Sequence, residues 1–220
     1  MEKFATAAPV TAVLEIPAGR VRFIAADRAD TTVEVLPANA AKGRDVKAAE
    51  QTTVEYADGV LRIQGPDSRQ ILGASGYVEV TVQLPAGSRL EAKTASAEFR
   101  GVGRFGDVAL DSAHGDIKID ETAALTLTTQ AGDIEIGRLG GPAEITTAKG
   151  DIRITEAMGG RVVLNTQAGD ITVGAATGVS ASLDAGTTRG RITNNLKNDG
   201  TADLNIQATT AYGDITAHSL

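Results

Sequence analysis

Apolar and polar residues alternate along much of this 220-residue chain. The clearest run extends from Tyr77 to Leu84, where every second residue is a valine or a leucine. A period of two is typical of a strand that buries one of its faces. Shorter runs of the same kind occur within residues 12–36 and 53–63, and an Asp-Gly turn divides the second of them. The pattern therefore predicts strands through the first part of the chain.

Two segments in this part lack the alternation. Residues 37–50 are rich in alanine and in charged residues, which predicts a surface excursion with one helical turn. Residues 64–76 predict a loop, because turn-forming residues interrupt the segment and no apolar period is visible.

From residue 90 onward one phrase recurs, [Leu/Ile]-x-[Ser/Thr]-x-x-Gly-Asp-Ile-x-[Ile/Val], at intervals of about 17–23 residues. One copy carries the variant Gly190-Arg191-Ile192. The glycine suits a corner, since it can adopt a positive φ at little cost. The repeat corners predicted from these copies are Gly115, Asp116, Gly132, Asp133, Gly150, Asp151, Gly169, Asp170, Gly213 and Asp214.

A unit of this length, with two short strands, cannot bury both of its faces alone. Stacked copies place like residues above one another at the parallel-strand spacing of about 4.8 Å. The isoleucine after each corner then forms an internal core ladder. Its predicted members are Ile117, Ile134, Ile152, Ile171, Ile192 and Ile215.

The repeat predicts an all-β fold, a parallel β-helix or β-solenoid of about 17–23 residues per rung. Short strands at such spacing also describe an antiparallel β-sandwich, but a sandwich has no reason to repeat its sequence at a fixed corner. We expect a single β-solenoid domain over residues 1–220. Within it, residues 10–88 would form irregular N-terminal rungs or capping strands, and residues 89–217 the regular repeats.

The last two copies differ from the others. Their large apolar residues, Leu183 and Ile206, stand seven positions before the glycine rather than five. We interpret this difference as two extra residues in the corners at 184–189 and 207–212, where a solenoid tolerates insertions. The final copy is followed by too few residues for a helical cap, so we expect an uncapped C-terminal rung that exposes strand edges.

Composition narrows the classes of function. There is no cysteine, which excludes disulfides, thiolate metal sites and cysteine nucleophiles. The formal net charge of −7, without a basic cluster, argues against nucleic acid and anionic membrane surfaces as partners. The sequence contains no run of about 18 apolar residues, so membrane insertion is not expected. The segment Met1–Val10 lacks an apolar signal-peptide core, so the chain as it stands is expected to be cytoplasmic, or at the cell surface if a leader was removed.

The column of corner aspartates is the candidate for chemistry. Calcium-binding β-rolls use a glycine-rich nine-residue phrase, whereas this chain has one Gly-Asp per copy. We therefore favour aspartates that accept hydrogen bonds from the corner backbone. Neither His114 nor His218 has partners at metal-ligand spacing. No catalytic, cofactor-binding or metal-binding residues are predicted, and the chain is not expected to be an enzyme.

The serial Gly-Asp-Ile-x-Ile phrase, with the Gly19-x-Val-x-Phe and Tyr77-to-Pro85 strands before it, resembles the bacterial "putative adhesin" family of β-strand-repeat domains of unknown function. The resemblance covers about Ala12 to Ala217. It implies a right-handed parallel β-helix-like domain, often tied to the cell envelope, with no catalytic residues to carry over. The rung length is also similar to that of bactofilins, cytoskeletal β-helices that polymerise end to end.

Three functional hypotheses follow. The first is a non-enzymatic, adhesin-like binding or scaffold module with a protein or envelope-associated partner. The second is a self-assembling, bactofilin-like structural protein, a homo-oligomer that polymerises through the uncapped C-terminal rung. The third is an enzyme acting on polysaccharide, which would need convergent acids and aromatic platforms that this sequence hardly offers.

Overall fold

The segments in which apolar and polar residues alternate form strands along most of the chain, and the apolar residues of these strands face inward. The structure is a computed structural model that describes residues 1–66 and 76–220. The loop expected over residues 64–76 falls mainly on residues 67–75, outside the described residues. Contacts within the chain divide it into two compact units, Met1–Gly115 (unit 1) and Asp116–Leu220 (unit 2). The single domain expected over residues 1–220 stays a prediction.

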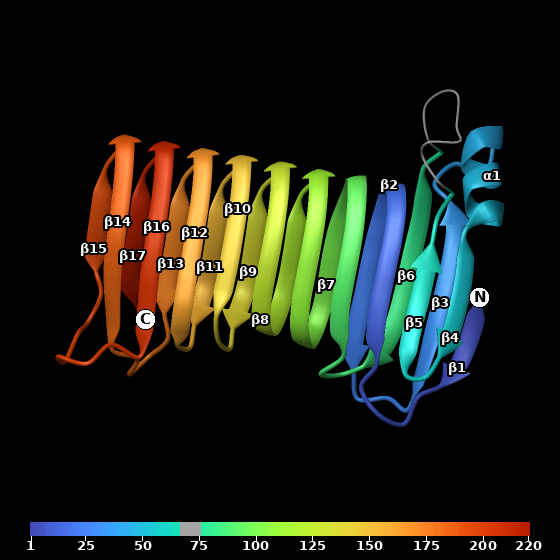
Figure 1. Cartoon of the computed structure of the whole chain (residues 1–220), viewed down its shortest axis with the longest axis horizontal. Coiled ribbons are helices and arrows are strands. Elements are labelled where there is room, and N and C mark those ends of the chain that lie inside the picture. The colour runs from blue at the N-terminus through green and yellow to red at the C-terminus, as the bar shows by residue number, and fades with distance from the viewer. Residues whose placement is uncertain (67–75) are drawn as a thin grey trace. The chain divides into compact units, whose positions relative to one another are not determined.

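Unit 1 mixes parallel and antiparallel strands with one helix (Figure 1). The long strand β2 pairs in parallel with β5, β6 and β7, whereas β1–β3, β3–β6 and β4–β5 are antiparallel. Its elements are β1 (Glu2–Ala5), β2 (Thr11–Ala26), β3 (Asp30–Pro37), α1 (Gly43–Gln51), β4 (Thr53–Ala57), β5 (Val60–Gln64), β6 (Val78–Pro85) and β7 (Arg89–His114). The strands before residue 89 lie outside the repeat phrase, whereas β7 ends at its first full copy.

Helix α1 replaces the single turn expected within residues 37–50. The apolar side of the helix buries Ala48, and its first turn carries Asp45, which is only 2% exposed. A carboxylate near a helix N-terminus is favoured by the helix dipole. The Asp45 Oδ1 atom also accepts a 3.0 Å hydrogen bond from the backbone N–H of Tyr77, so the helix is tied to the start of β6.

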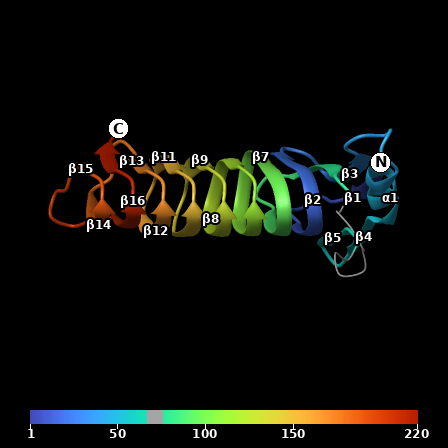
Figure 2. The ribbon, with the colours of Figure 1, turned by 90° about the horizontal axis from the view of Figure 1, so that it is seen from above.

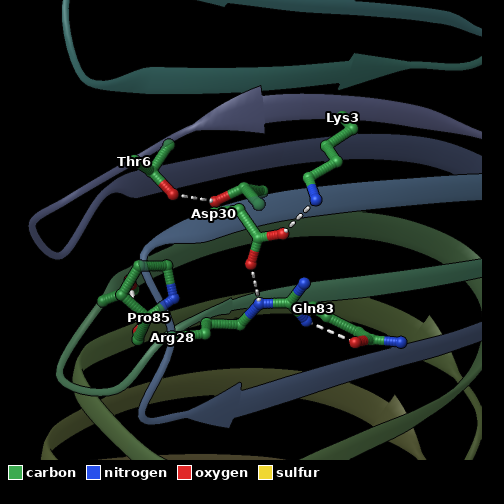
Figure 3. A network of polar contacts seen from close by, with 8 residues as sticks. Lys3, Thr6, Arg28, Asp30, Gln83 and Pro85 are labelled. Carbon is green, nitrogen blue, oxygen red and sulfur yellow. Dashed lines mark hydrogen bonds and ion pairs between the residues drawn. The ribbon is translucent and has the colours of Figure 1, made fainter.

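A polar network holds the first strands of unit 1 together (Figure 3). Asp30 lies at the start of β3 and accepts hydrogen bonds from Lys3 of β1 at 2.9 Å and from Arg28 at 2.8 Å. Arg28 also donates a hydrogen bond to Gln83 of β6. The network therefore links β1, β3 and β6 through side chains in addition to their backbone pairing.

Unit 2 is a stack of parallel strands in two layers, in which every pairing between described strands is parallel and close to in register. The segments before each Gly-Asp corner form one layer and those after it form the other, and the first strand contributes a segment to each. Its strands are β8 (Ile117–Ala131), β9 (Ile134–Leu139), β10 (Ala143–Lys149), β11 (Ile152–Ala157), β12 (Gly160–Ala168), β13 (Ile171–Ala175), β14 (Ala181–Arg189), β15 (Ile192–Asn195), β16 (Leu204–Tyr212) and β17 (Ile215–Ser219).

The core of unit 2 lies between the two layers. The isoleucine that follows each corner is buried in five of the six expected positions, whereas Ile192 is 43% exposed. Ile192 differs because it lies in a rung that pairs with a neighbour on one side only within the described residues. Burying an isoleucine from water contributes about 1.5–3 kcal/mol, so the ladder is a large part of the stability of the stack.

The last two rungs are stacked in the reverse of their sequence order. We call residues 204–219, with β16 and β17, the C-terminal rung, and residues 181–195, with β14 and β15, the outer rung. Strand β16 pairs with β12 on one side and β14 on the other, and β17 likewise lies between β13 and β15. Figure 1 shows this order as a red pair of strands between two orange pairs. The expectation that the C-terminal rung is uncapped is therefore wrong, because the outer rung covers it.

The expected insertions at 184–189 and 207–212 are also absent from the structure. Leu183 aligns with Ile206, and Ile206 aligns with Val162, which stands at the same distance from its own glycine. The position five before the glycine is filled by Ala185 and Ala208 rather than by a larger residue. The extra sequence lies instead in the connections between rungs, because the chain must skip one rung and return.

Candidate functional site

The corner aspartates of unit 2 form a continuous column of hydrogen bonds. In each corner the Oδ1 atom accepts a hydrogen bond of 2.7–3.0 Å from the backbone N–H that follows the glycine of the neighbouring rung. The acceptor and donor pairs are Asp116–Asp133, Asp133–Asp151, Asp151–Asp170, Asp170–Asp214 and Asp214–Arg191. The aspartates thus satisfy backbone donors that the corner leaves without a strand partner.

The glycines allow these corners to stack closely. Gly150 has a φ of 141°, and a side-chain Cβ at this position would lie 2.1 Å from the carbonyl oxygen of Gly132. In the corners of Gly169 and Gly213, a threonine three residues before the glycine adds a second bond between rungs. The Thr166 hydroxyl donates to the Gly150 carbonyl at 3.2 Å, and the Thr210 hydroxyl donates to the Gly169 carbonyl at 3.0 Å.

The corner column carries no sign of a metal centre. Among residues 1–66 and 76–220, no group of three or more His, Asp or Glu side chains is placed to hold a metal ion. On the outward face, Lys118 pairs with Glu135 at 2.8 Å, and Arg138 pairs with Glu156 at 3.4 Å. These pairs are exposed, so each contributes little to stability. The repeated polar residues serve the stacking of rungs.

A surface cavity in unit 1 offers a different kind of site. It has a volume of about 330 Å³ and lies on the outward face of β6, β2 and β7, which are adjacent parallel strands. Its side chains include an aromatic ring, a guanidinium, two carboxylates and a hydroxyl. They are Tyr77, Arg20, Glu79, Glu98 and Ser96. We call this group the Tyr77 cavity.

The Tyr77 ring is exposed, but its backbone is held on both sides. Its N–H donates to the buried Asp45 carboxylate, and its carbonyl accepts a 3.0 Å hydrogen bond from the N–H of Ala38. The phenol oxygen lies 3.4 Å from the Ser96 hydroxyl oxygen. The ring is 44% exposed, so it offers an apolar face in a defined position next to polar groups.

Arg20 occupies the middle of a row of charges across the three strands. It stands opposite Glu79 and Glu98 in the strand register. Its NH1 atom lies 3.3 Å from a Glu79 oxygen, and its Nε atom lies 3.2 Å from a Glu98 oxygen. All three side chains remain open to solvent, so the row can hydrogen-bond a polar ligand while its own pairs keep it in place.

Reasoning from the sequence did not single out the Tyr77 cavity. Tyr77 stands next to a strongly alternating strand, on its polar face, which is an unusual place for one of only three tyrosines. That position is a signal in the sequence. The neighbours Arg20, Ser96 and Asp45 are distant along the chain, and the strand register is needed to bring them together.

Two further surface cavities lie on the outward face of unit 2. One of about 390 Å³ is lined by Thr126, Glu144 and Arg161, among others. Another of about 310 Å³ includes Ser182 and Asn205, whose side-chain oxygens lie 3.0 Å apart. Neither is lined by an aromatic ring, so each is a polar strand surface without an apolar platform.

The fold and these features define an all-β protein with a solenoid-like stack of parallel repeats. The chain belongs to the Toastrack family, DUF4097, whose model matches residues 13–219. This match confirms the resemblance seen in the repeat phrase. A search of curated proteins found no match.

One solved structure shows the same fold at low sequence identity. This "putative adhesin" from Bacteroides fragilis has a TM-score of 0.56 and 13% identity, and the match covers 100% of this chain and 95% of that one. A "putative adhesin" from Parabacteroides distasonis has a TM-score of 0.46, 13% identity and the same coverage. A "putative cell adhesion protein" from Clostridium sporogenes has a TM-score of 0.41 and 10% identity, covering 100% and 98%. In the described part of this chain, no helix is long and apolar enough to cross a membrane.

Proposed function

We propose that this protein is a non-enzymatic, adhesin-like binding module and that the Tyr77 cavity is where it takes a polar ligand. The observation that carries the proposal is the exposed Tyr77 ring, held by Asp45 and Ala38 beside the Arg20 row. Sites of this kind combine an apolar face with a few placed hydrogen-bonding groups. The family and the adhesin naming of the Bacteroides fragilis structure support a binding role.

The ligand class that fits this chemistry best is a saccharide. A sugar ring has an apolar face of C–H groups that packs on an aromatic ring, and hydroxyls that bond to carboxylates, guanidinium and serine. A rigid ring and pre-paired charges lower the entropy cost of binding. The cavity is shallow and small, so one or two sugar units of a larger polysaccharide fit it better than a buried cofactor would.

Binding is favoured over polysaccharide cleavage by the arrangement of the two carboxylates. Glycosidases use one carboxyl group as an acid and the other as a base or nucleophile. Here Glu79 and Glu98 both pair with Arg20, which lies between them. One oxygen of each carboxylate is paired with the guanidinium, so the two groups do not face each other across an open cleft.

A glycan array carrying bacterial and host polysaccharides tests the proposal. Labelled wild-type protein should bind a subset of saccharides, and the Tyr77→Ala and Arg20→Ala variants should lose that signal. Arg153→Ala is the control for Arg20→Ala, because Arg153 is an exposed arginine of unit 2 that lies outside the outer rung. Absence of any binding, or equal binding by Tyr77→Ala, would contradict the proposed site. Release of reducing ends from the bound saccharide would contradict the non-enzymatic role.

An envelope-associated partner follows from the same proposal, because an adhesin-like module acts where surface polysaccharides are. Fractionation of the producing cells, followed by immunodetection of this protein, checks the location. Recovery with the envelope fraction supports the proposal, and recovery only with the cytoplasmic fraction contradicts it.

The coils of unit 2 are further proposed to wind right-handed. Parallel strands joined by a crossover within one sheet are right-handed in nearly all known cases, because of strand twist. An experimental structure of the protein with left-handed coils would overturn this point.

A further inference from the structure

The outer rung of unit 2 is attached in an unusual way. Strands β14 and β15 pair only with β16 and β17 within the described residues, so the outer rung touches the stack through the C-terminal rung alone. The chain passes from β13 over the place of the C-terminal rung, forms the outer rung, and then returns (Figure 2). The outer rung therefore cannot dock until the C-terminal rung is in place.

The residues of the outer rung differ from the repeat phrase in the way expected of the last rung of a stack. Position 191 is an arginine, whereas the matching positions of the other corners carry aspartate. An aspartate is needed only where a further rung brings an N–H to be accepted. Asn194 takes the place of the apolar residues at the matching positions, Val173 and Ala217. A polar last repeat is what stacked repeat proteins need to stay soluble.

The free edge of the outer rung is also partly closed by its own chain. The N–H of Ala181 donates to the carbonyl of Lys197 at 2.9 Å, and the carbonyl of Ala181 accepts from the Asn198 side chain at 3.0 Å. The N–H of Leu196 is bonded to the Asn194 side chain at 3.1 Å. Strand β15 has only four residues. Short strands and occupied backbone groups are ways in which proteins prevent edge-to-edge pairing.

The C-terminal rung has the opposite character. Its inward residues are at most 1% exposed, and they are Leu204, Ile206, Ala208, Thr210, Ile215 and Ala217. Its corner carries Asp214, whose carboxylate has the outer rung's Arg191 N–H as its donor. Without the outer rung, β16 and β17 would present unpaired backbone groups along regular strands beside an apolar core. Such an edge is a template for pairing with another chain.

We propose that the outer rung, residues 181–195, is an end cap that keeps the edge of the C-terminal rung from pairing with a second copy of this chain. The cap is held by backbone pairing with β16 and β17 and by a few side chains. Thr187 donates to the Gly213 carbonyl at 3.1 Å, and the Arg189 guanidinium lies 5.6 Å from the centre of the Tyr212 ring. From the sequence, the C-terminal rung is expected to promote assembly. In this proposal the outer rung covers that edge and prevents assembly.

Deletion of residues 177–202 removes the cap and restores consecutive rungs. The deletion leaves Ala176 and Asp203 between β13 and β16, which matches the two residues, Met158 and Gly159, that join β11 to β12. In size-exclusion chromatography with light scattering, the wild-type protein should be monomeric at all concentrations. The deletion variant, with a β-rich circular dichroism spectrum, should have twice the monomer mass or more. A wild-type dimer, or a folded and monomeric deletion variant, would overturn the proposal.

A point variant keeps the test decisive if the deletion variant does not fold. Leu183→Asp places a charge on the inward face of the outer rung, and Thr188→Asp places the same charge at an exposed position of the same strand. Leu183→Asp should release the rung and raise the mass to the dimer value, whereas Thr188→Asp should remain monomeric. A Leu183→Asp variant whose outer-rung amides exchange freely but which stays monomeric would refute the cap.

Hydrogen exchange on the intact protein gives a further measure. Amides of the outer rung should exchange about tenfold or more faster than those of the C-terminal rung, because the cap can open while β16 and β17 stay paired with β12 and β13. Slower exchange in the outer rung than in the C-terminal rung would contradict the proposed order of docking.

Discussion

The Asp214 carboxylate accepts a 2.8 Å hydrogen bond from the backbone N–H of Arg191, a residue 23 positions earlier in the sequence. In the other described corners of unit 2 the donor follows its acceptor along the chain, as Asp170 follows Asp151. The reversal arises because the C-terminal rung lies between its two predecessors. The donor and acceptor of this repeated hydrogen bond therefore show the spatial order of the rungs. Arg191 replaces the aspartate in the last rung of the stack.

Removal of one carboxylate should weaken the corner column locally. In Asp151→Ala the N–H of Asp170 loses its acceptor, so the free energy of unfolding should fall by about 1 kcal/mol. Chemical denaturation followed by circular dichroism measures the change. Asp151→Asn keeps a side-chain oxygen at the same place and should lose less than half as much. Equal stability of Asp151→Ala and the wild type would show that water replaces the acceptor without cost.

The corner glycine Gly150 should be much less tolerant of substitution than Gly186, which lies within strand β14. Gly150→Ala forces a Cβ to within 2.1 Å of the Gly132 carbonyl oxygen at a φ of 141°, which we expect to cost about 2 kcal/mol or more. Gly186→Ala is the control, because a Cβ added there would have nothing within 4 Å and the φ of Gly186 is not positive. The control should be neutral or stabilising by about 0.5 kcal/mol. Thermal and denaturant unfolding measure the stability of both variants. An equal loss of stability in Gly150→Ala and Gly186→Ala would contradict the stacking argument.

Truncation of an inward-facing isoleucine should depend on the rung that carries it. Ile154→Ala removes a fully buried side chain of β11 and should reduce the free energy of unfolding by about 2–5 kcal/mol. Ile192→Ala affects the half-open outer rung, where the side chain is 43% exposed, and should cost less than about 1 kcal/mol. Denaturant titrations of the two variants measure the difference. An Ile192→Ala loss as large as that of Ile154→Ala would mean that the outer rung is packed as firmly as the interior.

The repeat phrase is sufficient to predict the parallel stack, because equal spacing lets identical glycines and isoleucines lie above one another. The same regularity hides the order of the rungs. Every copy presents nearly the same edge, so the sequence around Gly213 fits beside Gly169 or Gly190 equally well. Only small differences, such as Arg191 and Asn194, mark the true end. The similarity of the repeats therefore determines the register between stacked strands, but it does not determine which rung lies next to which.

The misplaced insertions and the missed cavity have separate physical causes. Ala185 and Ala208 are small residues at a position that is usually large, and a search for large apolar residues passes over them. The Tyr77 cavity depends on a hydrogen bond from Tyr77 to Asp45, a residue of a helix for which the sequence pattern predicted only one turn. Long-range contacts of this kind have no period in the sequence.

The network around Asp30 should make the first strands of unit 1 sensitive to acid. The hydrogen bonds from Arg28 and then Lys3 lower the pKa of Asp30 from 3.8 to about 2. Because the pKa is lower in the folded state, the pairing stabilises the fold fully above about pH 4 and is lost as the pH falls toward about 2. The stability difference between wild type and Asp30→Asn, measured by denaturation from about pH 6 to about pH 2, should shrink over that window. High salt should reduce it at every pH, since the pair is partly exposed. A difference that stays constant down to about pH 2 would contradict the role of the Asp30 charge.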